Sequence, residues 1–356
     1  MKTSPAAATL LGGDDQVRVT RSESAPAAER IGDCTSSLRQ SPMEKAVGLV
    51  PDSTHETIVD HVLDFVRDRT RFGEKLAIVT LVAIDGSSPR PLGAQMAVSE
   101  TGQWVGYLSG GCLERAVVAE ALAALEDGAN RRVRYGRGSK YVDIRLSCGG
   151  AMEVVFDVHV AATEVQRALG ALERRRPAFL RIPDVGSDRA FMRRYLPRRR
   201  LMIVGVGPAA VFLGRLAAQS GLEVVLYSPD ASTRNTFSRD NLLSIPIRAG
   251  AAADFDADPW TAIVFMFHDH DWEADLVPAA LATSAFYIGA MGSRSTHNER
   301  IRMLERKGVA PALVARLRSP CGVSPGGKTA QAVAVSILAE VLQIDQAVNR
   351  EGLDAA

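Results

Sequence analysis

The 356-residue sequence has only four cysteines, Cys34, Cys112, Cys148 and Cys321, and they lie far apart. They form no CxxC pair and no closely spaced framework, which argues against a disulfide-stapled secreted domain and favours a reducing compartment. The sequence also lacks any run of about 18 apolar residues, the length that a membrane-spanning helix needs. Its first residues lack the basic-then-apolar layout of a secretory signal. We therefore expect a cytoplasmic protein with free thiols and no membrane partner.

An excess of charge of one sign is absent as well. Lys and Arg total 42 and Asp and Glu total 41, so the whole molecule has no general attraction to nucleic acid or to an anionic membrane. We expect no nucleic-acid partner. Basic clusters are local: Arg174–Arg176 and Arg198–Arg200 lie beside Pro177 and Pro197, and this arrangement predicts solvated boundaries.

Length and composition permit two globular domains, because 46% of the residues are hydrophobic and 23% are charged. Residues 1–46 are rich in Ala, Ser, Gly, Asp and Arg without an apolar period, and we expect a disordered leader. Residues 47–196 mix helical and strand patterns and predict an α+β domain. The expected helices of this domain are 54–71, 113–125 and 163–175, and its expected strands are 76–84, 95–98, 104–108, 132–135 and 152–160.

Residues 197–356 alternate between short apolar runs and helical stretches. This alternation predicts a Rossmann-like, doubly wound parallel sheet covered by helices, so the fold class is α/β. The expected strands are 201–204, 223–227, 245–248, 261–267 and 285–288, and the last helix is expected over 329–348.

A G-x-G-x-x-A turn, Gly205 to Ala210, follows the first of these strands. In that context the glycines let the backbone approach a phosphate, and the helix start supplies amide donors. The acid that normally ends the second strand and holds ribose hydroxyls is absent, since Ser228 stands there and Asp230 follows two residues later. An NAD(P)-dependent oxidoreductase is therefore an alternative, weakened by this absence.

Residues 322–329 fit the P-loop pattern G-x-x-x-x-G-K-[ST], with Lys328 in the lysine position. A working P-loop follows an apolar strand and needs an acid on another strand to hold Mg²⁺. Residues 311–318 instead predict a helix, and only a short segment follows the motif. ATP hydrolysis is a second alternative, and anion binding by Lys328 at the start of the last helix is the simpler interpretation.

Cys112 follows two glycines, Gly110 and Gly111, at the expected start of a helix. That position lowers the pKa of a thiol, and the resulting thiolate is a suitable soft ligand for a metal or a partner in sulfur transfer. The alternative is a small buried side chain. For Cys148, which precedes two further glycines, both interpretations stand equally.

Two other turns of the second domain have polar residues at strand ends, where doubly wound sheets bind ligands. His268 and His270 predict a polar cleft lining, with a zinc site as the alternative. In the next turn Ser293 can cap a helix and Arg294 offers a fork for phosphate. A plain capped turn is the alternative.

Taken together, these segments resemble the XdhC/CoxI family, the xanthine dehydrogenase accessory proteins. The resemblance rests on motifs that follow one another in the family's order over residues 75–345. They are Asp85-Gly-Ser-Ser-Pro-Arg90 with Gly93-Ala94, Gly110-Gly-Cys112-Leu-Glu114, Cys148-Gly-Gly150, His268-Asp269, Tyr287-Ile-Gly-Ala-Met-Gly-Ser-Arg294 and Ser336-Ile-Leu-Ala-Glu340. The sequence departs from the family pattern at residues 228–230, 267 and 328–332, all in the second domain.

The resemblance implies a homodimer that binds the molybdenum cofactor, supports its sulfuration with sulfur from a cysteine desulfurase, and inserts it into a xanthine dehydrogenase or an aldehyde oxidoreductase. We expect such a chaperone rather than a free-standing enzyme. Cys112 is the expected ligand of molybdenum. The expected cofactor-binding residues are Ser88, Arg90, Gly110, Gly111, Cys112, Glu114, Gly205, Gly207, His268, Ser293, Arg294 and Lys328.

Overall fold

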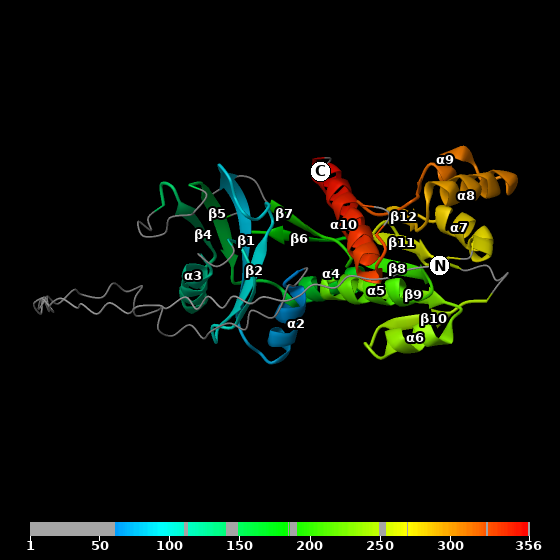
Figure 1. Ribbon diagram of the computed structural model, residues 1–356. Helices are drawn as coiled ribbons and strands as arrows, with labels where there is room; N and C mark the ends of the chain where they lie inside the picture. Colours follow the sequence, from blue (N-terminus) through cyan, green and yellow to red (C-terminus); the bar gives the residue numbers. More distant parts are fainter. Residues whose placement is uncertain are drawn as a thin grey trace, which may run out of the picture. The chain divides into compact units, whose positions relative to one another are not determined.

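The computed structural model describes residues 61–109, 113–139, 149–183, 185, 191–248, 254–268, 270–324 and 327–354. The expected leader and the first residues of the helix expected over 54–71 lie outside these ranges. Gly110, Gly111, Cys112 and Cys148 lie outside them too. The described chain contains a five-stranded antiparallel sheet, a six-stranded parallel sheet and a separate two-stranded sheet (Figure 1).

The antiparallel sheet has five strands in the order β3-β2-β1-β5-β4. Its strands confirm the pattern of apolar alternation, with ends shifted by one to three residues. Helix α3 covers one face, while α2 and α4 pack on the other. The bounds are β1 Leu76–Asp85, β2 Gln95–Ser99, β3 Trp104–Gly106, β4 Arg131–Gly136, β5 Ala151–Asp157, α2 Leu63–Arg71, α3 Glu114–Asp127 and α4 Ala162–Glu173.

A two-stranded hairpin, β6 (Ala178–Ile182) and β7 (Phe191–Tyr195), occupies the segment that the sequence suggested as a boundary. In β6 buried and exposed residues alternate strictly, as expected for a strand with one covered face. Ala178 and Leu180 of β6 and Tyr195 of β7 join the core under α2 and α4. The hairpin is thus part of the packed structure.

The parallel sheet has six strands in the order β10-β9-β8-β11-β12-β13. Numbered along the chain this is 3-2-1-4-5-6, the order of dinucleotide-binding folds, so the predicted doubly wound sheet is confirmed. Helices α5, α6 and α10 cover one face, and α7 and α8 cover the other. The strands are β8 Arg200–Gly205, β9 Glu223–Ser228, β10 Leu243–Pro246, β11 Thr261–Met266, β12 Tyr287–Ala290 and β13 Leu317–Arg318. The helices are α5 Pro208–Gln219, α6 Ala231–Ser238, η1 His270–Trp272, α7 Glu273–Leu281, α8 Arg294–Arg306, α9 Pro311–Val314 and α10 Ala330–Asp354.

The helix expected over 311–318 is only partly present. It ends at Val314 in α9, and Leu317 and Arg318 instead form β13. The reason is tertiary pairing, because these two residues complete the sheet beside Ile288 and Gly289 of β12. Local sequence pattern does not contain this information.

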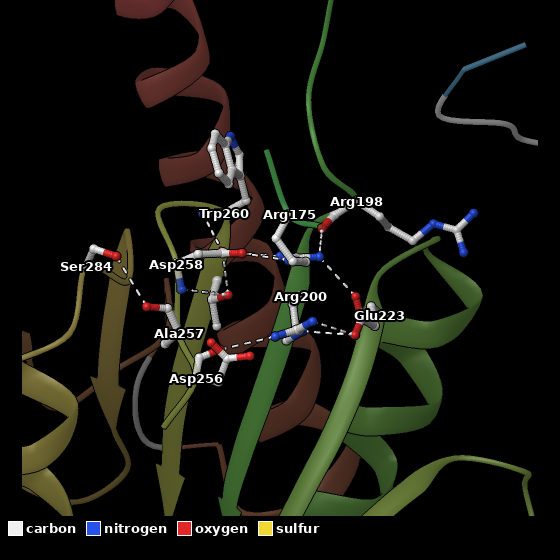
Figure 2. Close-up of polar contacts among 10 residues, drawn as sticks. Arg175, Arg198, Arg200, Glu223, Asp256, Ala257, Asp258, Trp260 and Ser284 are labelled. Carbon is white, nitrogen blue, oxygen red and sulfur yellow. Dashed lines mark hydrogen bonds and ion pairs between the residues drawn. The ribbon is translucent and has the colours of Figure 1, made fainter. Parts of the chain in front are cut away.

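Half-buried arginines from both basic clusters meet at the edge of the parallel sheet where its strands begin (Figure 2). Arg175 forms ion pairs with Asp258 at 2.6 Å and with Glu223 at 3.0 Å, and Arg200 pairs with Glu223 at 2.9 Å. Arg199 pairs with Asp345 of α10. The expectation that these clusters are solvated is therefore wrong for these three side chains. Acids elsewhere in the chain neutralise them.

None of the helices in the described ranges is long and apolar enough to cross a membrane. The domain division at residues 46/47 and 196/197 stays a prediction.

Candidate functional site

The loops that contain the sequence motifs of the antiparallel region leave one edge of the five-stranded sheet. In the register, Asp85 at the end of β1 and Gly136 at the end of β4 both pair with Ala151, the first residue of β5. Gly106 at the end of β3 pairs with Met96 at the start of β2. The described ends of the connections 86–94, 107–113 and 137–150 therefore lie at this edge. We call it the loop edge.

Two of these loops touch closely at Gly150. A Cβ added to Gly150 would lie 2.7 Å from the carbonyl oxygen of Ser87 and 2.8 Å from that of Asp85. Only glycine lets the backbones approach this far. The loop edge thus brings the residues after Cys148 against the Asp85-Gly-Ser-Ser motif.

Glu114 fixes the connection that contains Cys112. Its carboxylate accepts the amide N–H groups of Leu108 and Ser109 at 3.2 and 2.9 Å and the Ser109 hydroxyl at 2.9 Å. It also accepts the amide of Leu113 at 3.2 Å. Burial raises the pKa of Glu114, but these hydrogen bonds outweigh burial and place the pKa below its ordinary value. An ionised carboxylate therefore ties Ser109 to Leu113, on either side of Gly110–Cys112.

Ser88 and Arg90 lie on the 86–94 loop. The Ser88 hydroxyl donates to the carbonyl oxygen of Arg90 at 2.9 Å and accepts its amide at 3.3 Å, which folds the loop into a local turn. The side chain of Arg90 is exposed and has no ion pair or hydrogen bond within the described residues.

The structure adds a residue that sequence reasoning missed, Arg193 of β7. The position that a Cβ of Gly93 would occupy lies 3.1 Å from Arg193 Cδ and 3.5 Å from its Nε. This guanidinium therefore lies against the same loop as Arg90. No signal in the sequence marks it, because an arginine in a short alternating segment is normally solvent-facing.

A cavity of about 410 Å³ lies where the strands of the parallel sheet end. Ligands bind doubly wound sheets at this edge, at the point where strand order reverses, here between β8 and β11. The predicted residues His268 and Lys328 both line this cavity, and both are exposed. Val206 and Pro208, in the turn after β8, and Gly292, in the turn after β12, also line the cavity.

The glycine turn has two distinct roles. Gly205 packs the strands, since a Cβ there would lie 2.5 Å from the carbonyl oxygen of Met266. Gly207 has φ +87° and precedes α5, with open space where a Cβ would lie. Its amide already donates to the hydroxyl of Thr233 at 3.0 Å.

Asp230 is similarly engaged. Its carboxylate caps α6 by accepting the amide of Thr233 at 2.7 Å and the Thr233 hydroxyl at 2.5 Å. Ser228 is fully buried. Neither side chain presents a free carboxylate for ribose hydroxyls, and this geometry counts against conventional NAD(P) binding.

Ser293 and Arg294 are placed differently from the cavity residues. Ser293 caps α8 by accepting the amide of Thr296 at 3.1 Å, as its sequence position suggested. Arg294 is exposed, and neither residue is among those that line the cavity. No cluster of three or more His, Cys, Asp or Glu side chains suited to a metal occurs among the described residues.

Cys321 lines the cavity wall and is 6% exposed. Burial and the nearby charge of Glu340 raise the pKa of this thiol to about 12. Glu340 is held in place by the Tyr287 hydroxyl at 2.7 Å and the Gly322 amide at 2.6 Å. The cavity therefore contains a neutral thiol, unsuited to act as a nucleophile at neutral pH.

Two stretches of the chain match described families. Residues 201–341 match the XdhC Rossmann domain, and residues 70–136 match the XdhC and CoxI family. The chain is 33% identical over 301 residues to the molybdenum cofactor insertion chaperone PaoD of Escherichia coli (strain K12), covering 80% of this chain and 89% of that protein. It is 24% identical over 315 residues to a probable xanthine dehydrogenase subunit of Bacillus subtilis (strain 168), covering 76% and 93%.

A solved structure has a similar fold. The crystal structure of a xanthine dehydrogenase from Bacillus halodurans superposes with a TM-score of 0.66 at 20% identity, covering 82% of this chain and 96% of that one. At this identity the likeness concerns the fold alone.

Proposed function

We propose that this chain, which belongs to the XdhC and CoxI family, binds the molybdenum cofactor and delivers it to a molybdenum hydroxylase. The client we propose is a xanthine dehydrogenase or an aldehyde oxidoreductase. One observation carries the proposal: the described ends of the three connections that contain the family motifs lie together at the loop edge, where Glu114 ties Ser109 to Leu113. The relative PaoD, named a cofactor insertion chaperone, supports the same function.

Cys112 is the residue that we assign to molybdenum. It lies two residues before the first residue of α3, and a helix start stabilises a thiolate through its amide donors and dipole. A thiolate is the soft ligand that such a metal accepts. Gly110 and Gly111 would allow close approach of the cofactor, and Ser88 and Arg90 would contact its polar groups.

The cavity of the parallel sheet is our second proposed contact surface for the cofactor. Lys328 and His268 line it, and Gly207 lies in the chain between Val206 and Pro208, which also line it. Lys328 supplies a point charge for an anion near the start of α10. Gly205 would contribute by allowing β8 to pack closely against β11. Ser293 and Arg294 would contact the cofactor from the turn that follows Gly292.

We further propose that the chain acts in the cytoplasm as a homodimer and hosts sulfuration of the cofactor by a cysteine desulfurase. The desulfurase would supply the sulfur, and the residues of this chain would hold the cofactor while it is modified. On this account the chain is a carrier that protects its cargo, and the chemistry at sulfur belongs to the partner.

Transfer to a client tests the proposal. The chain, purified from cells that make the cofactor, is mixed with a cofactor-free molybdenum hydroxylase, and client activity and bound molybdenum are followed together. We expect both to rise with the wild-type chain and with Cys34→Ala, a cysteine variant in the leader, and to stay at background with Cys112→Ala. A client that gains no molybdenum from any form of the chain would exclude the delivery function.

A further inference from the structure

The guanidinium of Arg193 is a cation at the loop edge that has no counter-charge among the described residues. It is half-buried, and its Nε has no hydrogen-bond partner. Within the described residues its only hydrogen bond goes from Nη1 to the carbonyl oxygen of Arg194 at 2.5 Å, and no carboxylate of that part of the chain pairs with it. Two other arginines at this edge, Arg134 and Arg137, differ because they pair with Asp85 at 2.6 and 3.0 Å.

A built environment holds Arg193 in this position. Its guanidinium lies 5.0 Å from the centre of the Tyr195 ring, a cation–π contact. The Tyr195 hydroxyl donates to Gln95 at 2.8 Å, and the Gln95 amide donates to Thr80 at 2.9 Å, so a buried chain of hydrogen bonds fixes the ring. Gly93 has φ +80° and no Cβ, which makes room for the Arg193 stem.

Electrostatics make this arrangement unfavourable without an anion. Burial lowers the pKa of Arg193, and the nearby charge of Arg90 lowers it further. A desolvated charge that lacks an opposite charge destabilises the folded state. If Arg193 served only to pack against Tyr195, an apolar side chain would do so without this cost.

We propose that Arg193 and Arg90 together bind a phosphate group at the loop edge, and that this group is the terminal phosphate of molybdopterin. The assignment to molybdopterin rests on the proposed function. Two guanidinium forks match the tetrahedral oxygens of a phosphate ester. Arg193 lies against Gly93 of the 86–94 loop, and Arg90 belongs to this loop, which Ser88 folds into a turn. Arg193 thereby orients the pterin end of the cargo, while Cys112 takes the metal.

Three variants separate this binding role from a packing role. Arg193→Met keeps the stem and removes the charge, Arg193→Lys keeps the charge and removes the fork, and Arg181→Met removes an exposed arginine from the same hairpin as a control. The first readout is the melting temperature of the cofactor-free chain in inorganic phosphate against chloride at equal ionic strength. We expect phosphate to raise the melting temperature of the wild type and of Arg181→Met. In Arg193→Met, the phosphate concentration that gives half of the maximal rise should be about tenfold or more higher.

The melting temperature in chloride also separates the two roles. In chloride, Arg193→Met should melt no lower than the wild type, because it removes an unpaired desolvated charge. In phosphate, the stabilisation of Arg193→Lys should lie between those of the wild type and Arg193→Met. A lower melting temperature of Arg193→Met, together with an unchanged phosphate response, would show a packing role and overturn the proposal.

The second readout is the dissociation rate of pterin from the chain purified with its cofactor. We expect it to rise about tenfold or more in Arg193→Met and to stay unchanged in Arg181→Met. If Arg193→Met loses the phosphate response but releases pterin at the wild-type rate, the site binds free phosphate. That result would overturn our assignment and leave the proposed function intact. If the wild-type chain retains no pterin, the proposed function fails, and the assignment to molybdopterin fails with it even where the phosphate response depends on Arg193.

Discussion

The carboxylate of Glu114 accepts both the amide and the hydroxyl of Ser109 at 2.9 Å, five residues earlier in the chain. With the Leu113 amide at 3.2 Å, this contact closes the connection that contains Cys112. Glu114 is 2% exposed, so hydrogen-bond donors of the protein, these among them, stabilise its charge in place of water. The segment that we assign to molybdenum is thus held at both ends before any cargo arrives.

Replacing this carboxylate should weaken both the fold and the site. Glu114→Gln presents an amide NH₂ group where the structure needs an acceptor, and we expect a loss of about 1–3 kcal/mol in the free energy of unfolding. Denaturant titration measures it, with Glu126→Gln on an exposed part of the same helix as the control. Equal stability of the two variants would mean that Glu114 does not tie the connection together.

The same carboxylate predicts a dependence on pH. Because the pKa of Glu114 is lower in the folded chain than in the unfolded chain, its contribution is complete above the unfolded pKa and is lost as the pH falls through the folded pKa. The wild type should therefore lose more stability than Glu114→Gln on acidification from about pH 5 downward. An equal loss of unfolding free energy in the two proteins below about pH 5 would contradict this prediction.

Gly150 offers a test of how the loops meet. Gly150→Ala places a Cβ within 2.8 Å of two backbone oxygens, and we expect a loss of about 1–3 kcal/mol with reduced cofactor content. Gly170→Ala in α4 is the matched control, since its Cβ has ordinary contacts and alanine favours a helix by about 0.5–1 kcal/mol. A stable Gly150→Ala variant would show that the two loops do not touch in this way.

Cys321 should be unreactive in the folded protein. With a pKa of about 12 and almost no exposed surface, its thiol stays protonated at pH 8. Iodoacetamide labelling followed by mass spectrometry should modify it only after unfolding in urea. Rapid labelling in the native protein would mean that the cavity wall opens, and that Cys321 is available for sulfur chemistry.

The parallel sheet should fail to bind NADH in the usual way. The Gly207 amide is engaged by Thr233, and the Asp230 carboxylate caps α6. We expect no saturable fluorescence transfer at micromolar NADH. Saturable binding at that concentration with turnover of a substrate would support the oxidoreductase alternative.

Much of the fold was predictable because periodicity and burial coincide in it. The strands β1, β8 and β11 are continuous apolar runs, and the glycine turn after β8 marked the doubly wound sheet. The hairpin β6–β7 was missed because prolines and arginines flank it, although residues 178–182 alternate as a strand. Arg175, Arg199 and Arg200 find acids far away in sequence, which no local pattern encodes.

The candidate site was also predictable only in part. Glycine-flanked motifs pointed to the loop edge, and strand ends pointed to the cavity with His268 and Lys328. The sequence could not reveal that Glu114 acts on the backbone, that Thr233 occupies the Gly207 amide, or that Arg193 lacks a counter-charge within the described chain. Each of these depends on which distant groups the fold brings within hydrogen-bond distance.

The central claim is that the loop edge binds the molybdenum cofactor through Cys112. The most direct measurement is the pterin and molybdenum content of the purified chain for the wild type, Cys112→Ala and Cys34→Ala. We predict about one cofactor per chain in the wild type and in Cys34→Ala, and loss of most of it in Cys112→Ala. Equal cofactor content in Cys112→Ala would contradict the assignment.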